Sequence, residues 1–243
     1  MLAAVPPIPL PQLVVALLPA VVVVVFLFRW TNDGRRAAYA VLRMLVQLVL
    51  VGYVLSTIFE LHRATLVLVV LAGMLAAASW IALGPVEGVR KANYLRALAA
   101  IAAGGVSTLL LVTQAVLDLD PWFAPRYVIP LAGMTFANAM NSVSLAAERF
   151  EAERVKQASY AEARQIAFRA SLIPVINSLF AVGLVSFPGM MTGQILSGVS
   201  PLIAARYQIM VMSMVFGASG IASACYLRLA AENDERLELA TKN

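Results

Sequence analysis

The apolar residues of this chain are gathered in seven long blocks that are separated by short polar stretches. Each block holds about 20 residues, the length that an α-helix needs to cross the hydrocarbon core of a bilayer. The blocks are residues 10–28, 37–59, 64–83, 95–117, 127–147, 171–196 and 207–230. The pattern therefore predicts an all-α polytopic membrane protein with seven transmembrane helices, in which residues 1–243 form a single transmembrane domain.

The composition supports a membrane protein. Hydrophobic residues make up 61% of the 243 residues and charged residues only 13%, whereas soluble domains are about one quarter charged. A soluble fold of this composition would have too few charges to cover its surface. No Lys or Arg precedes the first block, although a cleavable signal peptide requires a basic start, so we expect this block to be retained as a span.

The basic residues predict the orientation of the spans. Connections after the odd-numbered blocks contain 14 Lys and Arg residues, whereas those after the even-numbered blocks contain three, Arg63, Arg126 and Arg206. Cytoplasmic loops are enriched in Lys and Arg. We therefore expect the N-terminus outside and the C-terminus in the cytoplasm. The net charge of +5 is attributed to these loops rather than to binding of nucleic acid.

One of the connections predicted to be cytoplasmic is longer than the others. Residues 148–170 are polar and carry charges of alternating sign. We predict a solvated helix that extends the fifth span, a break near residues 157–159, and a short second helix from Tyr160. Glu162 would lie in the first turn of that helix, where the helix dipole favours an acid. This insert is either an ordinary solvated loop or a docking surface for a cytoplasmic partner. The residues of the docking hypothesis are Tyr160, Glu162, Arg164 and Arg169.

Sequence motifs for catalysis are missing. No glycine is followed by lysine, so the chain has no G-x-x-x-x-G-K-[ST] loop for binding ATP phosphates. Neither HExxH nor GxSxG occurs. The single cysteine, Cys225, excludes an intrachain disulfide and a site of several thiolates. The chain also has only one histidine, His62. We expect no enzymatic activity in this chain and no cofactor.

Polar side chains inside the spans are candidates for a site, because they are costly in lipid and usually face protein or a cavity. Arg43 and Gln47 are four residues apart, and Asn138 and Asn141 are three apart, so each pair shares a helix face. In the alternative interpretation, Arg43 snorkels to the membrane surface and the asparagine amides join one helix to another.

A further candidate is the segment PGMMTGQ, residues 188–194, in the sixth block. We expect Pro188 and Gly189 to interrupt the helix, and Gly189 and Gly193 form a GxxxG pair that permits close packing. Broken helices that line a cavity recur in transporters, whereas the alternative is a simple packing kink. The hypothetical path combines Asn138, Asn141, Arg43 and Gln47 with Pro188, Gly189, Met190, Met191, Thr192 and Gln194.

Ligands for a metal ion are sparse in the sequence. Three acids near the outer ends of the spans, Glu60, Asp118 and Asp120, are weak candidates for holding a hard cation. The ten methionines offer thioethers, which suit soft cations. Methionine more often fills irregular gaps in apolar interfaces.

Three stretches resemble the FetB/YbbM family. They are VLRMLVQLVLVGYVLSTIF (41–59), VIPLAGMTFANAMNSVSLAAERF (128–150) and VGLVSFPGMMTGQILSGVSPLIAARYQIMV (182–211). That family comprises bacterial ABC-transporter permeases implicated in iron export, with plant relatives involved in aluminium tolerance. The resemblance implies a multi-pass permease of the cell (inner) membrane that works with a separate cytoplasmic ATPase subunit in metal efflux. Seven helices per chain are few for a gated path, so we expect two copies of the permease to act together as a homodimer.

In one respect the sequence departs from this family. Many relatives have a longer segment between the RF of the fifth span and the LIP of the sixth, whereas here residues 151–171 are short. The coupling element would then be reduced to residues 160–170. The alternatives are an ABC exporter of a small organic solute, a stand-alone channel or secondary transporter, and a scaffold protein of the membrane.

Overall fold

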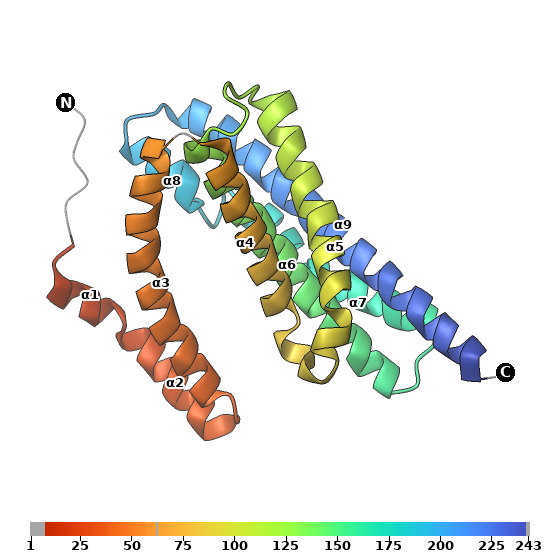
Figure 1. Ribbon diagram of the computed structural model, residues 1–243. Coiled ribbons are helices and arrows are strands. Elements are labelled where there is room, and N and C mark those ends of the chain that lie inside the picture. The colour runs from red at the N-terminus through yellow and green to blue at the C-terminus, as the bar shows by residue number, and fades with distance from the viewer. Residues whose placement is uncertain (1–7, 62, 242–243) are drawn as a thin grey trace. The chain divides into compact units, whose positions relative to one another are not determined.

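The computed structural model describes residues 8–61 and 63–241, and these residues form helices joined by short connections, as predicted (Figure 1). The chain divides into two compact units, residues 1–62 and residues 63–243.

Unit 1 is a helical hairpin. α1 (Leu10–Ala16) and α2 (Leu18–Trp30) together occupy the first predicted span, and α3 (Gly34–Leu61) occupies the second. Gly34 is buried at the turn, where a Cβ would lie 2.8 Å from the Cα of Phe28, so a larger residue would force the two helices apart. The large apolar side chains of these helices are mostly exposed, which suits helices surrounded by lipid.

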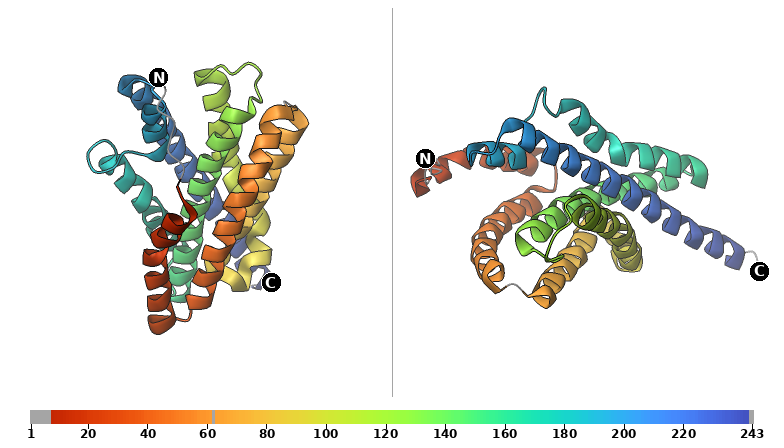
Figure 2. Two further views of the ribbon diagram at one scale, coloured as in Figure 1. Left: turned by 90° about the vertical axis from the view of Figure 1, so that its left-hand side faces the viewer. Right: turned by 90° about the horizontal axis from the view of Figure 1, so that it is seen from above.

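Unit 2 contains the remaining elements. They are α4 (Ala64–Ala82), η1 (Gly84–Val89), α5 (Arg90–Leu110), η2 (Leu111–Val116), α6 (Pro125–Val155), α7 (Tyr160–Ala181), α8 (Gly189–Leu196) and α9 (Pro201–Thr241). η1 and the α6–α7 connection lie at one end of the unit, whereas the α5–α6 loop and α8 lie at the other (Figures 1 and 2). The long helices of unit 2 therefore run between these two ends in alternating directions.

α6 is the central helix of unit 2 and packs against α4, α5, α7 and α9. Small residues such as Ala132, Ala139 and Ala146 are fully buried on it. Small side chains let helix backbones approach closely, which matters in lipid because no hydrophobic drive brings helices together there.

α5 and α9 make the most extensive helix contact of unit 2. A Cβ on Gly104 would lie 2.7 Å from the backbone nitrogen of Ala222, and nearer still to the carbonyl oxygen of Ala218. At Gly189 or Gly193, by contrast, a Cβ would meet nothing within 4 Å in the described chain. The structure thus places a tight glycine contact at Gly104 and not at the GxxxG pair that the sequence indicated.

Five helical stretches are long and apolar enough to cross a membrane, judged by length and composition over the described residues. They are Leu10–Trp30, Gly34–Leu55, Ala64–Ala82, Arg90–Val116 and Pro201–Ala230. α6 and α7, which correspond to the fifth and sixth predicted spans, are not among them. α6 is covered by four neighbouring helices and can carry more polar residues for that reason. The count of seven spans and the orientation of the termini stay predictions.

The sixth predicted span is not one helix. α7 ends at Ala181, the chain turns at Gly183 with φ of +82°, and α8 begins after Pro188. A positive φ favours glycine, which explains a break at this position. The predicted interruption of the sixth block is present, but it begins earlier than expected, at residue 182, and ends at Pro188, which is the N-cap of α8. Within the sixth block, the proline that lies inside a helix is Pro174, in α7.

The polar insert has the predicted helix–turn–helix form. α6 extends to Val155, residues 156–159 form the turn, and α7 begins at Tyr160. The hydroxyl of Ser159 accepts the backbone N–H of Glu162 at 3.3 Å and caps α7. The second helix is not short, however, because α7 continues to Ala181. One unbroken helix therefore joins the insert to the interior of unit 2.

Candidate functional site

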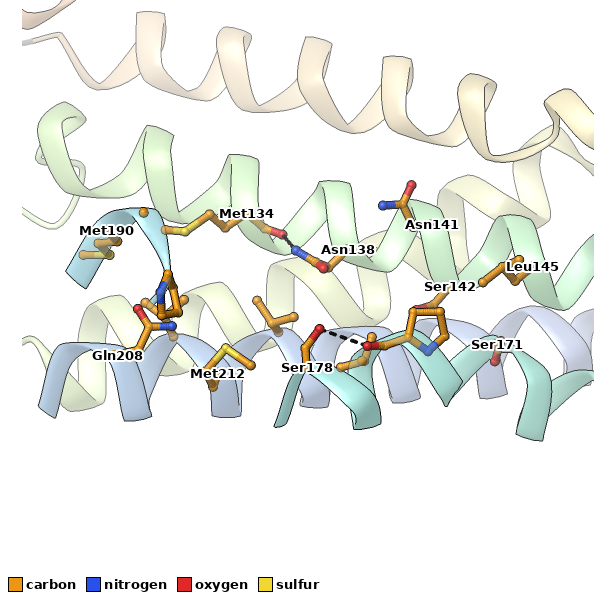
Figure 3. Close-up of a pocket in the computed structure, with 16 residues that line it drawn as sticks. Met134, Asn138, Asn141, Ser142, Leu145, Ser171, Ser178, Met190, Gln208 and Met212 are labelled. Carbon is orange, nitrogen blue, oxygen red and sulfur yellow. Dashed lines mark hydrogen bonds between the residues drawn. The ribbon is translucent and has the colours of Figure 1, made fainter. Parts of the chain in front are cut away.

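A pocket of about 260 Å³ lies within unit 2 between α6, α7, α9 and the start of α8 (Figure 3). Four elements that are distant in the sequence meet there. The polar residues that line it are Asn138, Asn141, Ser142, Ser171, Ser178 and Gln208. The pocket combines several polar groups with apolar walls, which is the usual character of a small-molecule site.

The α6 wall carries the two predicted asparagines. Asn138 is half-buried, and its Nδ2 donates a hydrogen bond of 2.8 Å to the carbonyl oxygen of Met134 (Figure 3). That bond lies within α6, so it does not join two helices. Asn141 is exposed and also lines the pocket. The cofacial placement predicted from their spacing is therefore confirmed.

The start of α8 closes one end of the pocket. The pocket lined by the two asparagines is also lined by Pro188, Gly189 and Met190. The rest of the predicted segment lies elsewhere. Met191 lines an adjoining apolar hollow of about 370 Å³ next to α9, which shares Gln208 and Met212 with the pocket. Thr192 is exposed and donates to the carbonyl oxygen of Pro188 at 3.2 Å.

Gln194 lies on α8 outside the pocket. Its side chain is half-buried, and its Oε1 has no hydrogen-bond partner within the described chain. Only the first three residues of the segment 188–194 therefore contribute to this pocket.

The sequence did not reveal the contribution of α9 and α7. Gln208 is only 5% exposed, and its Oε1 is buried without a hydrogen-bond partner among the described residues. Ser178 donates to the carbonyl oxygen of Pro174 at 2.9 Å (Figure 3). The one signal available was an isolated glutamine in the apolar run of the seventh block. Its position relative to α6 could not be inferred from that run.

Unit 1 carries two further candidates. Arg43 and Gln47 are both exposed on α3, whereas the pocket is formed by residues of unit 2 alone. The interpretation of Arg43 and Gln47 as path residues stays a prediction.

The acidic candidates do not line the pocket. Asp118 and Asp120 are exposed in the loop between α5 and α6. Glu60 and His62 lie outside the residues whose side chains the structure describes. Over the described part of the chain, no three His, Cys, Asp or Glu side chains are grouped so that they could hold a metal ion.

The lining of the pocket consists of amides, hydroxyls, thioethers and hydrocarbon. The three thioethers belong to Met134, Met190 and Met212, and with Gln208 they gather at one end of the pocket (Figure 3). None of these groups titrates near neutral pH. The pocket is therefore suited to binding and solvating a polar molecule rather than to acid–base or nucleophilic chemistry.

A second group of predicted residues lies at the connection between α6 and α7. The Tyr160 hydroxyl donates to the carbonyl oxygen of Leu227 in α9, and the Tyr160 ring packs edge-on against Phe150 with 5.4 Å between centroids. The guanidinium of Arg164 lies 5.9 Å from the centre of the Tyr160 ring. Tyr160 therefore faces the body of unit 2, whereas Glu162, Arg164 and Arg169 are exposed.

A buried acid holds the end of α6 in place. Glu153 is 7% exposed, and its Oε1 accepts from Arg149 at 2.9 Å and from Lys156 at 3.1 Å. Arg154 donates to the carbonyl oxygen of Ala158 at 3.2 Å. These contacts hold the turn between α6 and α7, and the charged first turns of α7 follow directly after it.

These features describe a multi-pass helical membrane protein with a polar, uncharged pocket between its helices. The chain belongs to the uncharacterised protein family UPF0014, whose model matches residues 10–233. No solved structure matches the chain.

Several relatives are about one third identical to this chain. A UPF0014 membrane protein of Synechocystis is 36% identical over 189 residues, covering 71% of this chain and 73% of that protein. The probable iron export permease protein FetB of Escherichia coli is 34% identical over 207 residues, covering 78% of each. The protein ALUMINUM SENSITIVE 3 of Arabidopsis thaliana is 33% identical over 200 residues, covering 76% and 72%. The family therefore includes a protein named as a permease.

Proposed function

We propose that this chain is the membrane-spanning permease subunit of an ABC exporter, driven by a separate cytoplasmic ATPase. One observation carries the proposal. α7 begins with exposed charged residues at the polar insert and continues without a break to Ser171 and Ser178 in the pocket. A force applied to the start of this helix would reach the pocket directly.

The contacts of Tyr160 extend this coupling to two further helices. Its hydroxyl is bonded to α9, and its ring contacts Phe150 of α6. A push on residues 160–169 by the ATPase would therefore move α7 together with α9, which is bonded to Tyr160 at Leu227 and carries Gln208 on the pocket near its start. Two copies of the chain would act with two ATPase subunits, because seven helices are few for enclosing a gated path.

Metal efflux, with iron as the cargo, is the substrate proposal. It is supported by the relative named as a probable iron export permease. The pocket between α6, α7, α8 and α9 is the proposed path. An exporter of a small organic solute is the alternative, and the uncharged lining of the pocket is compatible with such a solute.

Reversing the charges of Glu162 and Arg164 should detach the ATPase. Both side chains are exposed, and exposed charges contribute little to stability, so the double variant Glu162→Arg/Arg164→Glu should fold normally. We expect at least a tenfold loss of ATPase recovered with the tagged permease, and loss of ATP-dependent metal uptake by inside-out vesicles.

The matched control is Arg126→Glu, an exposed charge at the other end of unit 2. It should keep both the association and the transport. Normal ATPase recovery and transport in the Glu162/Arg164 variant would rule out docking at this helix, and ATP-independent transport by the wild type would favour a channel or a secondary transporter.

Reporter fusions should place the odd-numbered connections in the cytoplasm. Fusions after Arg36, Arg96 and Glu153 should report the cytoplasm, and fusions after Arg63 and Asp120 should report the outside. The expectation rests on the distribution of 14 against three basic residues. A single fusion of the first group that reports the outside contradicts the seven-span arrangement.

A further inference from the structure

The chemistry of the pocket restricts what can pass through it. We propose that its cargo is a polar species whose charge is already neutralised, either a metal ion enclosed by its own chelating ligand or an uncharged polar solute, and that Gln208 is the residue that recognises it. This inference rests on the proposed function in placing the cargo in this pocket.

The uncharged lining of the pocket disfavours a bare metal ion. Within the described chain, none of the residues that line the pocket is Asp, Glu, Lys, Arg or His. A bare divalent or trivalent cation would find no anionic ligand there to replace any water of hydration that it gave up, which is unfavourable. Hard cations in proteins are typically held by carboxylates among other oxygen ligands, and Asp118 and Asp120 are exposed in the α5–α6 loop. A cargo of zero net charge avoids this cost.

The volume of the pocket also exceeds what a bare metal ion would fill. A volume of about 260 Å³ corresponds to roughly nine water molecules, at about 30 Å³ each. A bare metal ion is smaller than one water molecule and would leave most of this space unfilled. A small chelate or a polyol would contact several walls of the pocket at once.

Gln208 offers the cargo a buried hydrogen-bond acceptor. Its side chain is nineteen-twentieths buried, it lines the pocket, and its Oε1 has no hydrogen-bond partner in the described chain. Figure 3 shows it at the same end of the pocket as Met190 and Met134. A buried acceptor that is left unpaired is unfavourable, so native structures usually give it a partner. A cargo that carries hydroxyl or amide hydrogens would supply one.

Asn138 and Ser178 complete the polar contacts. The Nδ2 of Asn138 and the hydroxyl of Ser178 each donate to a backbone carbonyl of their own helix. Their oxygens keep free lone pairs and can accept hydrogen bonds. Acceptor oxygens of Asn138, Ser178 and Gln208 are thus available on the pocket, which suits a cargo that donates hydrogen bonds.

Binding to the purified permease tests this inference without the ATPase. The full chain is placed in phosphatidylcholine nanodiscs and equilibrated with three radiolabelled probes. These are the neutral iron(III) tris(acetohydroxamate) complex, myo-inositol as an uncharged polyol, and aqueous Mn²⁺. We expect saturable retention of one of the two neutral probes, at least tenfold weaker in Gln208→Leu, and no retention of Mn²⁺. Retention of the iron complex identifies a chelate as cargo, and retention of myo-inositol identifies an uncharged solute.

Two control variants keep the test decisive. Gln114→Leu removes an amide from η2, outside the pocket, and should bind as the wild type does. Asp118→Asn/Asp120→Asn should also be unaffected. Retention of Mn²⁺ that is lost in the aspartate variant, or retention of none of the probes, would overturn the inference. Specific binding without ATP-driven transport would instead leave the pocket assignment standing and contradict the proposed exporter.

Discussion

Replacing Gly104 with alanine is expected to destabilise the folded protein more than any other single-methyl change in unit 2. The new Cβ would lie 2.7 Å from the backbone nitrogen of Ala222 and even closer to the carbonyl oxygen of Ala218. Because both atoms belong to the backbone of α9, no side-chain rotation can relieve the clash. α5 and α9 would have to separate, although they share the most extensive helix contact of the unit.

The magnitude follows from two opposing terms. Overpacking of a close-packed interior costs about 1–3 kcal/mol, and an alanine in a helix regains about 1 kcal/mol at most relative to glycine. Because the clash is with backbone atoms, the cost is taken at the upper end of its range, and the net loss is then about 2 kcal/mol, which corresponds to a drop in Tm of roughly 4–8 °C for a chain of this size. Gly104→Leu should yield no monodisperse protein.

The matched control is Gly220→Ala on α9, where a Cβ would meet nothing within 4 Å. It should leave the Tm unchanged or raise it slightly. Thermal unfolding of the detergent-solubilised proteins, followed by fluorescence size-exclusion, measures both variants. A Gly104→Ala protein as stable as the wild type would show that α5 and α9 do not meet as described.

Removing the Tyr160 ring is expected to uncouple transport from ATP hydrolysis. Tyr160→Ala deletes the hydrogen bond to Leu227, the ring contact with Phe150 and the contact with Arg164. We expect at least a tenfold loss of ATP-dependent transport, while the ATPase still co-purifies because Glu162 and Arg164 remain on the exposed face. The ring is only half-buried, so the stability loss should be about 2 kcal/mol, below that of a core aromatic.

Two further variants separate coupling from packing. Tyr160→Phe keeps the ring and loses only the hydroxyl bond, so it should retain an intermediate rate of transport. Tyr127→Ala removes an exposed tyrosine at the other end of α6 and should transport normally. Transport and ATP hydrolysis are measured on the same vesicles. Unchanged coupling in Tyr160→Ala would mean that α7 transmits motion without the bond to α9.

The local features of the fold were readable from the sequence. Lipid offers no hydrogen bonds to the backbone, so an apolar block of about 20 residues forms a helix, in which the backbone groups bond to one another. The alternating charges after Ala147 identified the polar insert. The helix–turn–helix around residues 156–159 was also predicted correctly. The shared face of Asn138 and Asn141 follows from helical spacing alone.

Several predictions failed where the outcome depended on neighbouring helices. The break of the sixth block extends over residues 182–188, with a turn at Gly183, whereas the prediction placed it at Pro188 and Gly189. The short helix predicted from Tyr160 is the beginning of a long one. Periodicity could not distinguish these cases, since α7 is helical on both sides of the predicted boundary at residue 171.

The sequence by itself determined that the chain is an all-helical membrane protein, where its polar insert begins, and which polar residues share a helix face. Only the tertiary structure decided that Asn138, Met190 and Gln208 line one pocket, and that the tight glycine contact is at Gly104. The physical reason is the range of the interactions. Helix formation depends on residues within a few positions and on the solvent, both of which a local pattern records. Helix packing depends on the fit of small side chains from segments far apart in the chain, which no local pattern contains.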